Sequence, residues 1–357
     1  DDTRVEADAI DLDFAAQRGI RGDRQAVERL IGRGNVVMTQ GGDRITCDGI
    51  DVALTTDADG RSQPRTATAT GDVVAVQGER TLHARDKLVA DFAPLAEVDA
   101  GERAARTGVK RLQAVGAVTV FDPAQKLDLS AEELDCTVVN GREIEKALVT
   151  GTAQSPASVR LDTLTVTGRR ITLDVPDQWA EVPGEGRLTL MSGKDLDGRK
   201  VSKPIPIIIT WSDSMKYRGR ENRAFFSGAV HATSETTTTF DCDQLLVEFD
   251  DAPLLPAKAA KVNEWGILQA FVDTAMRKEK AGKVRLAGGA FAKEPAYILA
   301  DGHAVAEMSE MDAKTGELAS RSRIAGPKLS VNLRSDVSKM LIEGPGTLQL
   351  EDFRPDS

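Results

Sequence analysis

Aromatic side chains make up only 4% of the sequence, and no run of 18 consecutive apolar residues occurs. Scarce aromatics argue against a platform that stacks nucleic-acid bases, and the missing apolar run predicts that no helix spans a membrane. Basic side chains are also outnumbered, with 46 Lys and Arg against 56 Asp and Glu, which gives a net charge of −10. The chain therefore lacks the basic surface that nucleic-acid binding requires.

Cysteine and histidine are equally scarce and widely spaced. Three cysteines are too few for a disulfide framework and too scattered for a zinc site, and their odd number leaves at least one unpaired. The histidines have no metal-ligand spacing either. The residues concerned are Cys47, Cys136, Cys242, His83, His231 and His303. We therefore expect buried, free thiols, no metal, no cofactor and no nucleophilic enzyme chemistry.

The chain is instead rich in internal repeats. A length of 357 residues allows one long domain or two to three compact ones. A ten-residue pattern recurs, in the order apolar, any, small, any, any, apolar, any, apolar, any, apolar. One copy reads Ile45, Cys47, Ile50, Val52 and Leu54. Further copies begin at Val5, Leu129, Val166, Phe240 and Ile324, with an extended copy at Leu82 and a degraded one at Ile298.

The spacing of the copies supports a true repeat. The small position falls at 7, 47, 84, 131, 168 and 242, with steps of 40, 37, 47, 37 and 74 residues. A second half-motif, Gly followed two residues later by Val, usually lies upstream, as at Gly34 and Val36 or Gly116 and Val118. Such periodicity indicates a stack of similar structural units.

Alternating apolar residues indicate strands with one buried face. Within the pattern the apolar phase shifts by three residues after the small position, and a regular strand cannot keep both halves facing inward. A bend or bulge there restores the facing. The sequence thus predicts an all-β fold of stacked, bent antiparallel strands. The positions expected to line its interior are Val36, Met38, Ile50, Val52, Val73, Val118, Val120, Leu134, Val230, Leu245 and Val247.

One segment departs from the strand pattern. Residues 257–280 have apolar side chains at helical spacing, including Trp265, Leu268 and Phe271, and predict an amphipathic helix. Residues 99–106 predict a shorter helical turn. The longer helix either covers an edge of the sheet, or it gates the interior or docks on a partner or membrane surface.

The repeated segments resemble a known family. VERLIGRGNVVM with ITCDGIDVAL, and VKRLQAVGAVTV with LDLSAEELDCTV, resemble the OstA-like domains of the lipopolysaccharide transport bridge. The resemblance covers most of the chain from Val5 to Leu350 and implies an elongated β-taco or β-jelly roll. It suggests a multi-repeat relative with OstA-like blocks at residues 1–190 and 191–357, or one continuous sheet.

The resemblance also implies a function. It suggests non-enzymatic binding and transport of lipopolysaccharide-like lipid in the periplasm, with acyl chains in an apolar groove. Neighbouring chains, copies of this chain or other envelope transport proteins, would join edge to edge through β-strands. Arg169, Arg170, Arg218 and Arg220 are the cations available for a lipid head group. Because the chain begins with Asp1, we expect that its signal segment has been removed.

Two other functions remain open. A closed core would make the chain a structural or assembly scaffold of the envelope. A repetitive β-protein could also be a polysaccharide lyase or hydrolase, which needs clustered charged groups. Asp241 and Asp243 beside Arg218 and Arg220 are the candidates, although most exposed acids of this chain share a face in the same way. We therefore expect no catalytic residues.

Overall fold

The computed structural model describes residues 3–19, 22–40, 42–56, 62–94, 107–139, 143–234, 238–251, 293–312, 315, 317–334 and 339–353. These residues form 24 strands and one short 3-10 helix. The prediction of an all-β fold is confirmed. The helix predicted at residues 257–280 and the helical turn predicted at 99–106 lie outside the described residues. The chain divides into two compact units near Ala157.

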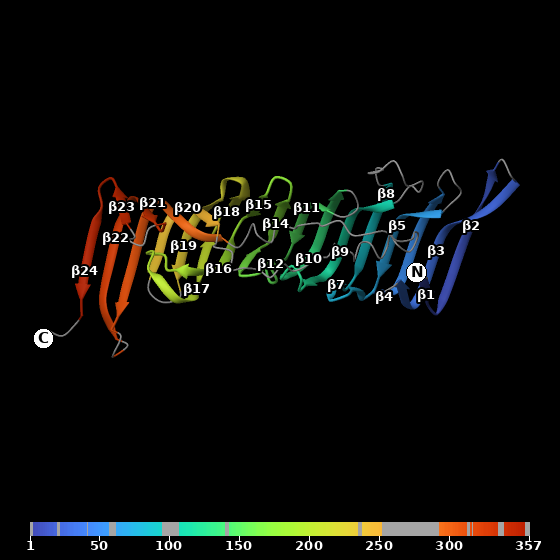
Figure 1. Cartoon of the computed structure of the whole chain (residues 1–357), viewed down its shortest axis with the longest axis horizontal. Coiled ribbons are helices and arrows are strands. Elements are labelled where there is room, and N and C mark those ends of the chain that lie inside the picture. The colour runs from blue at the N-terminus through green and yellow to red at the C-terminus, as the bar shows by residue number, and fades with distance from the viewer. Residues whose placement is uncertain are drawn as a thin grey trace. The chain divides into compact units, whose positions relative to one another are not determined.

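Unit 1 covers residues 1–157 and also 259–286, of which the latter lie outside the described residues. Its strands are coloured blue to green in Figure 1. They are β1 (Thr3–Glu6), β2 (Ala9–Gly19), β3 (Gly22–Gln40), β4 (Asp43–Thr56), β5 (Ser62–Thr70), β6 (Val73–Gln77), β7 (Arg80–Ala84), β8 (Lys87–Pro94), β9 (Thr107–Asp122), β10 (Leu127–Val139) and β11 (Glu143–Thr150).

Unit 2 covers residues 158–258 and 287–357, and β12 (Ala157–Leu161) begins at its boundary. Its other elements are β13 (Leu164–Gly168), β14 (Arg170–Asp174), β15 (Trp179–Pro183), β16 (Gly186–Lys194), β17 (Lys200–Trp211), β18 (Ser214–Arg218), η1 (Gly219–Glu221), β19 (Arg223–Ser234), β20 (Thr238–Asp251), β21 (Lys293–Met311), β22 (Leu318–Asn332), β23 (Lys339–Glu343) and β24 (Thr347–Asp352). The division suggested by the sequence, between residues 190 and 191, falls inside β16.

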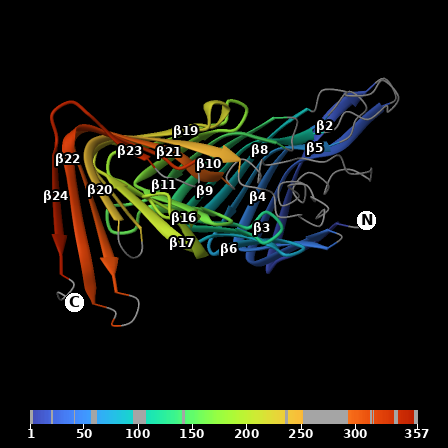
Figure 2. The same ribbon diagram turned by 60° about the vertical axis from the view of Figure 1, so that its left-hand side comes forward.

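Each long strand of unit 1 is divided by a bend into two arms. One arm of β4 pairs with β5 and the other with β6, and the two arms of β9 pair with β8 and β7 in the same way. Figure 2 shows β5 and β8 together in one arm and β6 in the other. Some copies of the ten-residue pattern run through the bend as one strand, as in β4 and β10, whereas others are divided, as in β7 and β8.

The bend is a β-bulge built on glycine. Gly34 and Asn35 both have positive φ, +74° and +47°, and the register of β3 with β4 slips by one residue there. The extra residue lies on β3, where the inward residues Gly32 and Val36 keep an even spacing. On the paired strand β4, the inward residues Cys47 and Ile50 are three residues apart, so the phase shift of the ten-residue pattern lies opposite the bulge. The same pair of left-handed residues recurs at Gly71, Gly116, Gly228 and Gly302, each with the residue that follows. The bend predicted within the ten-residue pattern is present in β4, whose two arms pair with β5 and β6. The bulge itself lies on the neighbouring strand, in the Gly-x-Val half-motif, and not in the ten-residue pattern.

One copy of the pattern was assigned to the wrong half-motif. The degraded copy at Ile298 predicts inward positions at His303 and Val305, but His303 is the second residue of a bulge, with φ +47°, and it is exposed. Ala304 and Ala306 are buried instead. Gly302 therefore belongs to the Gly-x-Val half-motif, with Ala in the place of Val.

Candidate functional site

Inward residues of unit 1 form rows in which each residue lies directly opposite the next across paired strands, and we call two of these rows A and B. Row A comprises Ile10, Gly32, Ile50, Ala69, Leu88, Ala114, Leu134 and Val149. Row B comprises Val5, Met38, Ile45, Ala75, Leu82, Val120 and Leu129. From β4 to β10, large residues of row A alternate with alanine, which lets neighbouring strands pack without voids.

Unit 2 has rows of the same kind, of which we call two C and D. Row C comprises Val166, Leu188, Ile209, Ala232, Phe240, Ala306, Ile324 and Leu348. Row D comprises Val182, Met215, Phe226, Leu245, Ala300, Leu329 and Ile342. Directly opposed apolar pairs of this kind stabilise antiparallel sheets, and here they extend one apolar line across successive strands.

Ten of the eleven side chains expected to line the interior are buried, and Val52 is half-buried. Ile50, Leu134, Met38, Val120 and Leu245 belong to the rows, and the others are inward neighbours of row residues on the same strands. Their burial supports the strand phase derived from the sequence. That they contact lipid stays a prediction.

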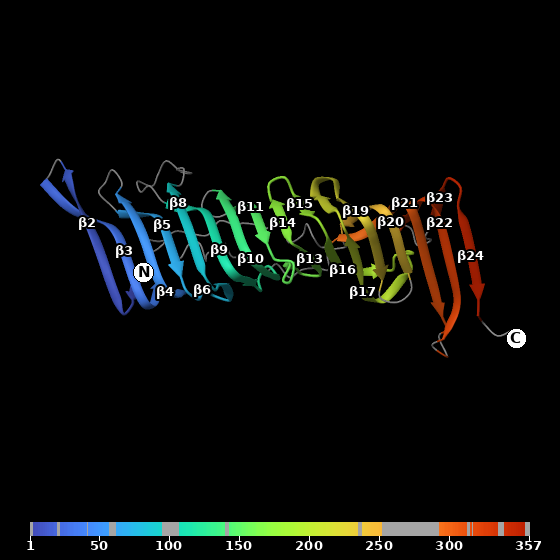
Figure 3. The same cartoon turned by 180° about the vertical axis from the view of Figure 1, so that it is seen from behind.

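Burial ends at the edge strands. Among the described strands, β2 pairs with β3 alone, and its inward residues Ile10, Leu12 and Phe14 are 44%, 45% and 54% exposed. In unit 2, β24 pairs with β22 alone (Figure 3), and Leu348 and Leu350 are 60% and 71% exposed. Rows A and C thus run from a buried interior onto an exposed apolar strand whose outer backbone groups have no strand partner in the described part of the chain.

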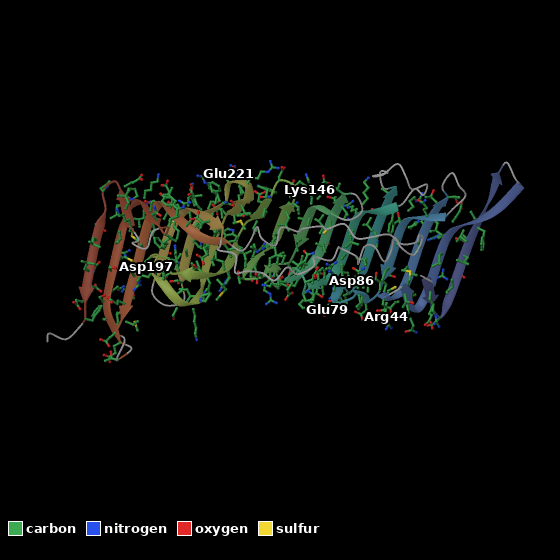
Figure 4. All side chains as sticks on the ribbon, viewed as in Figure 1. Arg44, Glu79, Asp86, Lys146, Asp197 and Glu221 are labelled. Carbon is green, nitrogen blue, oxygen red and sulfur yellow. The ribbon has the colours of Figure 1, made fainter. Side chains whose placement is uncertain are left out.

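The outer faces are charged, and ion pairs link side chains of neighbouring strands. Arg29 donates two hydrogen bonds to Asp51, at 2.9 and 2.5 Å, and Arg111 does the same to Asp135 at the equivalent place of the next long hairpin. These hydrogen bonds hold the pKa of both carboxyl groups below the usual range, although partial burial acts in the opposite direction. In Figure 4, Arg44 and Glu79 lie at one end of the unit 1 strands and Lys146 at the other.

Each of the three histidines has an aspartate partner. His83 Nε2 lies 2.7 Å from Asp72, and the Nδ1 atoms of His231 and His303 lie 2.7 and 2.9 Å from Asp241 and Asp243. The last two contacts involve the carboxylates considered above as catalytic candidates. Both acids are engaged at separate positions on the outer face, and the described residues contain no group of three or more side chains placed to hold a metal ion.

The cysteines are packing residues. All three are buried and free, as expected. Burial raises the pKa of Cys47 to about 11 and that of Cys136 and Cys242 to about 12. The thiols are therefore protonated at neutral pH and are poor nucleophiles.

Most of the arginines proposed as head-group contacts already have carboxylate partners. Arg169 lies 3.3 Å from Glu185, Arg218 3.2 Å from Glu221, and Arg220 3.0 Å from Asp177. Arg170 is exposed at the start of β14. The structure brings Arg218 and Arg220 into one cavity, lined also by Trp179, and places Arg169 and Arg170 outside it.

The comparisons with known proteins find only distant structural likeness. No family model and no curated protein matches the sequence. A similar solved structure is LptH of Pseudomonas aeruginosa, the LptA-homologous periplasmic component of the lipopolysaccharide transport device. It is 13% identical over 35% of this chain and 76% of its own, with a TM-score of 0.26. A porin-like protein from Bacteroides uniformis is 8% identical over 88% of this chain and 94% of its own, with a TM-score of 0.12. Neither likeness assigns a function.

No helix among the described residues is long and apolar enough to cross a membrane.

Proposed function

We propose that this chain is a non-enzymatic lipid carrier of the periplasm, which holds the acyl chains of a lipopolysaccharide-like lipid against its inward rows. The observation that carries the proposal is the continuity of rows A and C, which run strand by strand from the interior onto exposed apolar edges. A carrier needs an apolar path that reaches its own boundary, because cargo must enter and leave. The OstA-like resemblance of the repeated segments supports the same function.

The energetics of such a path favour apolar cargo. Each methylene group removed from water contributes about 0.8 kcal/mol, so a long acyl chain binds without any polar contact. Side chains of the rows succeed one another at the spacing of neighbouring strands, about 4.8 Å. An extended acyl chain laid across the strands would contact one row residue after another. Cargo could then advance along a row by small steps, none of which exposes the whole chain to water.

We propose that such carriers join through the exposed edges. Backbone groups of an edge strand pair readily with a strand of another chain. Pairing at β2 or β24 would extend row A or row C into the neighbour and cover the exposed side chains of Ile10, Phe14, Leu348 and Leu350. The partner is a second copy of this chain or another envelope transport protein of similar fold. The description of the chain as two OstA-like blocks belongs to the same proposal.

A second function, an envelope scaffold with a closed core, is favoured by one observation. The members of rows A and B from β4 to β10 are at most 8% exposed, which is the packing of an ordinary core. In a scaffold, the apolar rows would only stabilise the sheet. In a carrier, the two arms must part, or the cargo must displace side chains.

Photo-crosslinking in cells separates the two functions. A photoreactive side chain at Leu348, which is already 60% exposed and faces inward on β24, should capture lipid, whereas one at the adjacent outward Gln349 should not. Interior positions Ile50, Val118 and Leu245 are compared with outward Asp51 and Glu248 in the same way. The adducts are identified by mass spectrometry.

The edge positions keep the experiment informative if a bulky group unfolds the core. Lipid capture confined to inward positions supports the carrier. Equal capture at Leu348 and Gln349, or no lipid at any inward position of a folded variant, removes the carrier and leaves the scaffold.

A further inference from the structure

Trp179 lies on the wrong side of its strand for a core residue. On β15, Ala180 and Val182 are buried and face inward, so Trp179 faces outward, where it is half-buried. Trp211, by contrast, is buried, packs on Phe226 at a ring distance of 5.2 Å, and donates its indole N–H to the carbonyl of Gly184. No described residue accepts a hydrogen bond from the indole N–H of Trp179. An outward indole with an unused donor is a feature of binding surfaces.

Two hairpin turns enclose this indole. Trp179 lies directly opposite Asp174 on β14 and Arg218 on β18, so the three side chains stand in line across neighbouring strands. The turn before β15 and the turn at η1 are joined by a 2.7 Å hydrogen bond from the backbone N–H of Gly219 to the carbonyl of Gln178. Figure 4 shows Glu221 of the second turn at the upper end of the unit 2 strands in that view.

Arg220 fixes the first turn to the second. Its guanidinium donates hydrogen bonds to the carbonyl of Pro176 at 3.1 Å and to the carboxylate of Asp177 at 3.0 Å. Between the two turns lies a cavity of about 440 Å³, within the range of small-molecule sites, about 300–1,000 Å³. We call it the hairpin pocket. Its lining comprises Asp174, Asp177, Trp179, Arg218, Arg220 and Glu221.

The charges of the hairpin pocket nearly cancel. Arg218 donates to Glu221 at 3.2 Å, and its guanidinium lies 5.6 Å from the centre of the Phe225 ring. Three carboxylates and two guanidiniums thus surround one indole. An acyl chain finds too little apolar surface there, and a phosphate group would lie beside three anionic side chains. The described residues include no metal-binding group.

A sugar ring uses all of these groups at once. Its C–H groups carry slight positive charge and pack on the negative face of an indole. Neighbouring hydroxyl groups donate to both oxygens of a carboxylate or accept from the paired N–H groups of a guanidinium, which are bidentate contacts. We propose that the hairpin pocket binds a neutral saccharide, with Trp179 as the stacking surface. This inference does not depend on lipid transport, since it concerns a different face of the molecule.

The test uses the full chain and three neutral probes, the methyl glycosides of glucose, galactose and mannose. Saturation-transfer-difference NMR should show contact between at least one glycoside and the protein, strongest at the ring protons that face the indole. Trp179→Ala should weaken that binding about tenfold, because the stacking surface is lost. Glu221→Gln, which keeps the size of the side chain and removes its charge, should weaken it less.

Phe121→Ala is the matched control, because Phe121 is an outward aromatic of unit 1 that is 47% exposed and lies outside the hairpin pocket. This variant should bind the glycoside as the wild type does. Circular dichroism verifies that each variant is folded. Binding that survives Trp179→Ala unchanged, a response to inorganic phosphate or calcium but to none of the glycosides, or no response at all overturns the proposal. Lipid capture at Leu348 is measured separately, so either proposal can fail alone.

Discussion

The carboxylate of Asp86 occupies the place where a β-carbon on Gly116 would lie. Gly116 has φ +87°, and its carbonyl accepts a 2.6 Å hydrogen bond from the backbone N–H of Arg85 one strand away. The same relationship joins Gly34 to Asp8, Gly71 to Asp48, and Gly302 to Asp243. Each bend of the sheet therefore needs glycine for two reasons, its backbone conformation and the carboxylate that fills its space.

Replacement of that glycine separates the two reasons. Gly116→Ala should destabilise unit 1 by about 2 kcal/mol or more, because Ala resists the left-handed conformation and must also displace Asp86. Gly78→Ala is the control, since Gly78 also has positive φ, +55°, but nothing lies within 4 Å of its would-be β-carbon. It should cost about 1 kcal/mol. Urea denaturation measures the free energy of unfolding of both variants. An equal decrease for Gly116→Ala and Gly78→Ala would show that the contact with Asp86 contributes nothing.

A charge introduced on the inward face tests the strand phase. Val120→Asp and Val247→Asp should each lower the free energy of unfolding by about 3–5 kcal/mol, because the carboxylate would be buried without a partner. Both side chains are buried, 8% and 1% exposed. Thr119→Asp, on the exposed side of the same strand as Val120, should cost little. Thermal melting checks all three variants, and wild-type melting of both valine variants would contradict the assigned facing.

Stability should fall in acid through the outward ion pairs. Hydrogen bonds from Arg111, with a further one from Gln113, lower the pKa of Asp135 in the folded state below its ordinary value of 3.8, against the opposite effect of partial burial. A carboxyl group whose folded pKa is lowered stabilises the fold above the unfolded value and loses that contribution as the pH falls through the folded value. The pKa of Asp51 is lowered in the same way by hydrogen bonds from Arg29, so its contribution to stability is also lost in acid.

Asp135→Asn measures this contribution. The variant should be less stable than the wild type at neutral pH, and the difference should shrink below pH 3.8, where the wild-type carboxylate itself becomes protonated. Urea denaturation at several pH values gives the curve. A difference that does not change with pH would mean that Asp135 acts only through its shape.

The edge of unit 2 should mediate association. Gln349→Pro introduces a residue without an N–H into β24, so it should prevent a further strand from pairing there while the strands of unit 1 stay folded. Gln154→Pro, in the exposed turn between β11 and β12, is the control and should assemble normally. Sedimentation velocity measures assembly. A wild-type chain that stays monomeric at high concentration and recruits no envelope transport protein would contradict edge pairing.

Local sequence patterns predicted the repeating part of this fold well. The ten-residue pattern and the Gly-x-Val half-motif are set by near neighbours along the chain, because alternation and left-handed turn residues act within one strand. They therefore located the bend of β4 and the inward facing of Ile50 and Leu245. They placed the bulge in the ten-residue pattern, whereas it lies at Gly34 on the neighbouring strand. At Gly302, the residue two positions after the glycine is Ala304 and not valine. The same reasoning chose the wrong half-motif there, since alanine carries a weaker apolar signal than valine.

Contacts between residues far apart in sequence were beyond that reasoning. Nothing in the alternation pairs Asp86 with Gly116, His303 with Asp243, or Trp179 with Arg218, because strand register decides which side chains stand opposite each other. A partial signal for the hairpin pocket existed, namely an apolar Trp179 out of phase between Asp177 and Ala180. The pocket residues from β18 and η1 lie 39 residues or more after Trp179 in the sequence.

The sequence by itself determined that this chain is a stack of bent β-strands with one apolar face, because side-chain alternation and backbone sterics are local properties. Only the tertiary structure decided how far the apolar rows extend, which of their members reach an exposed edge, and which outward groups gather into the hairpin pocket. Those features depend on strand pairing over tens of residues, and pairing minimises the free energy of the whole sheet rather than of any one segment.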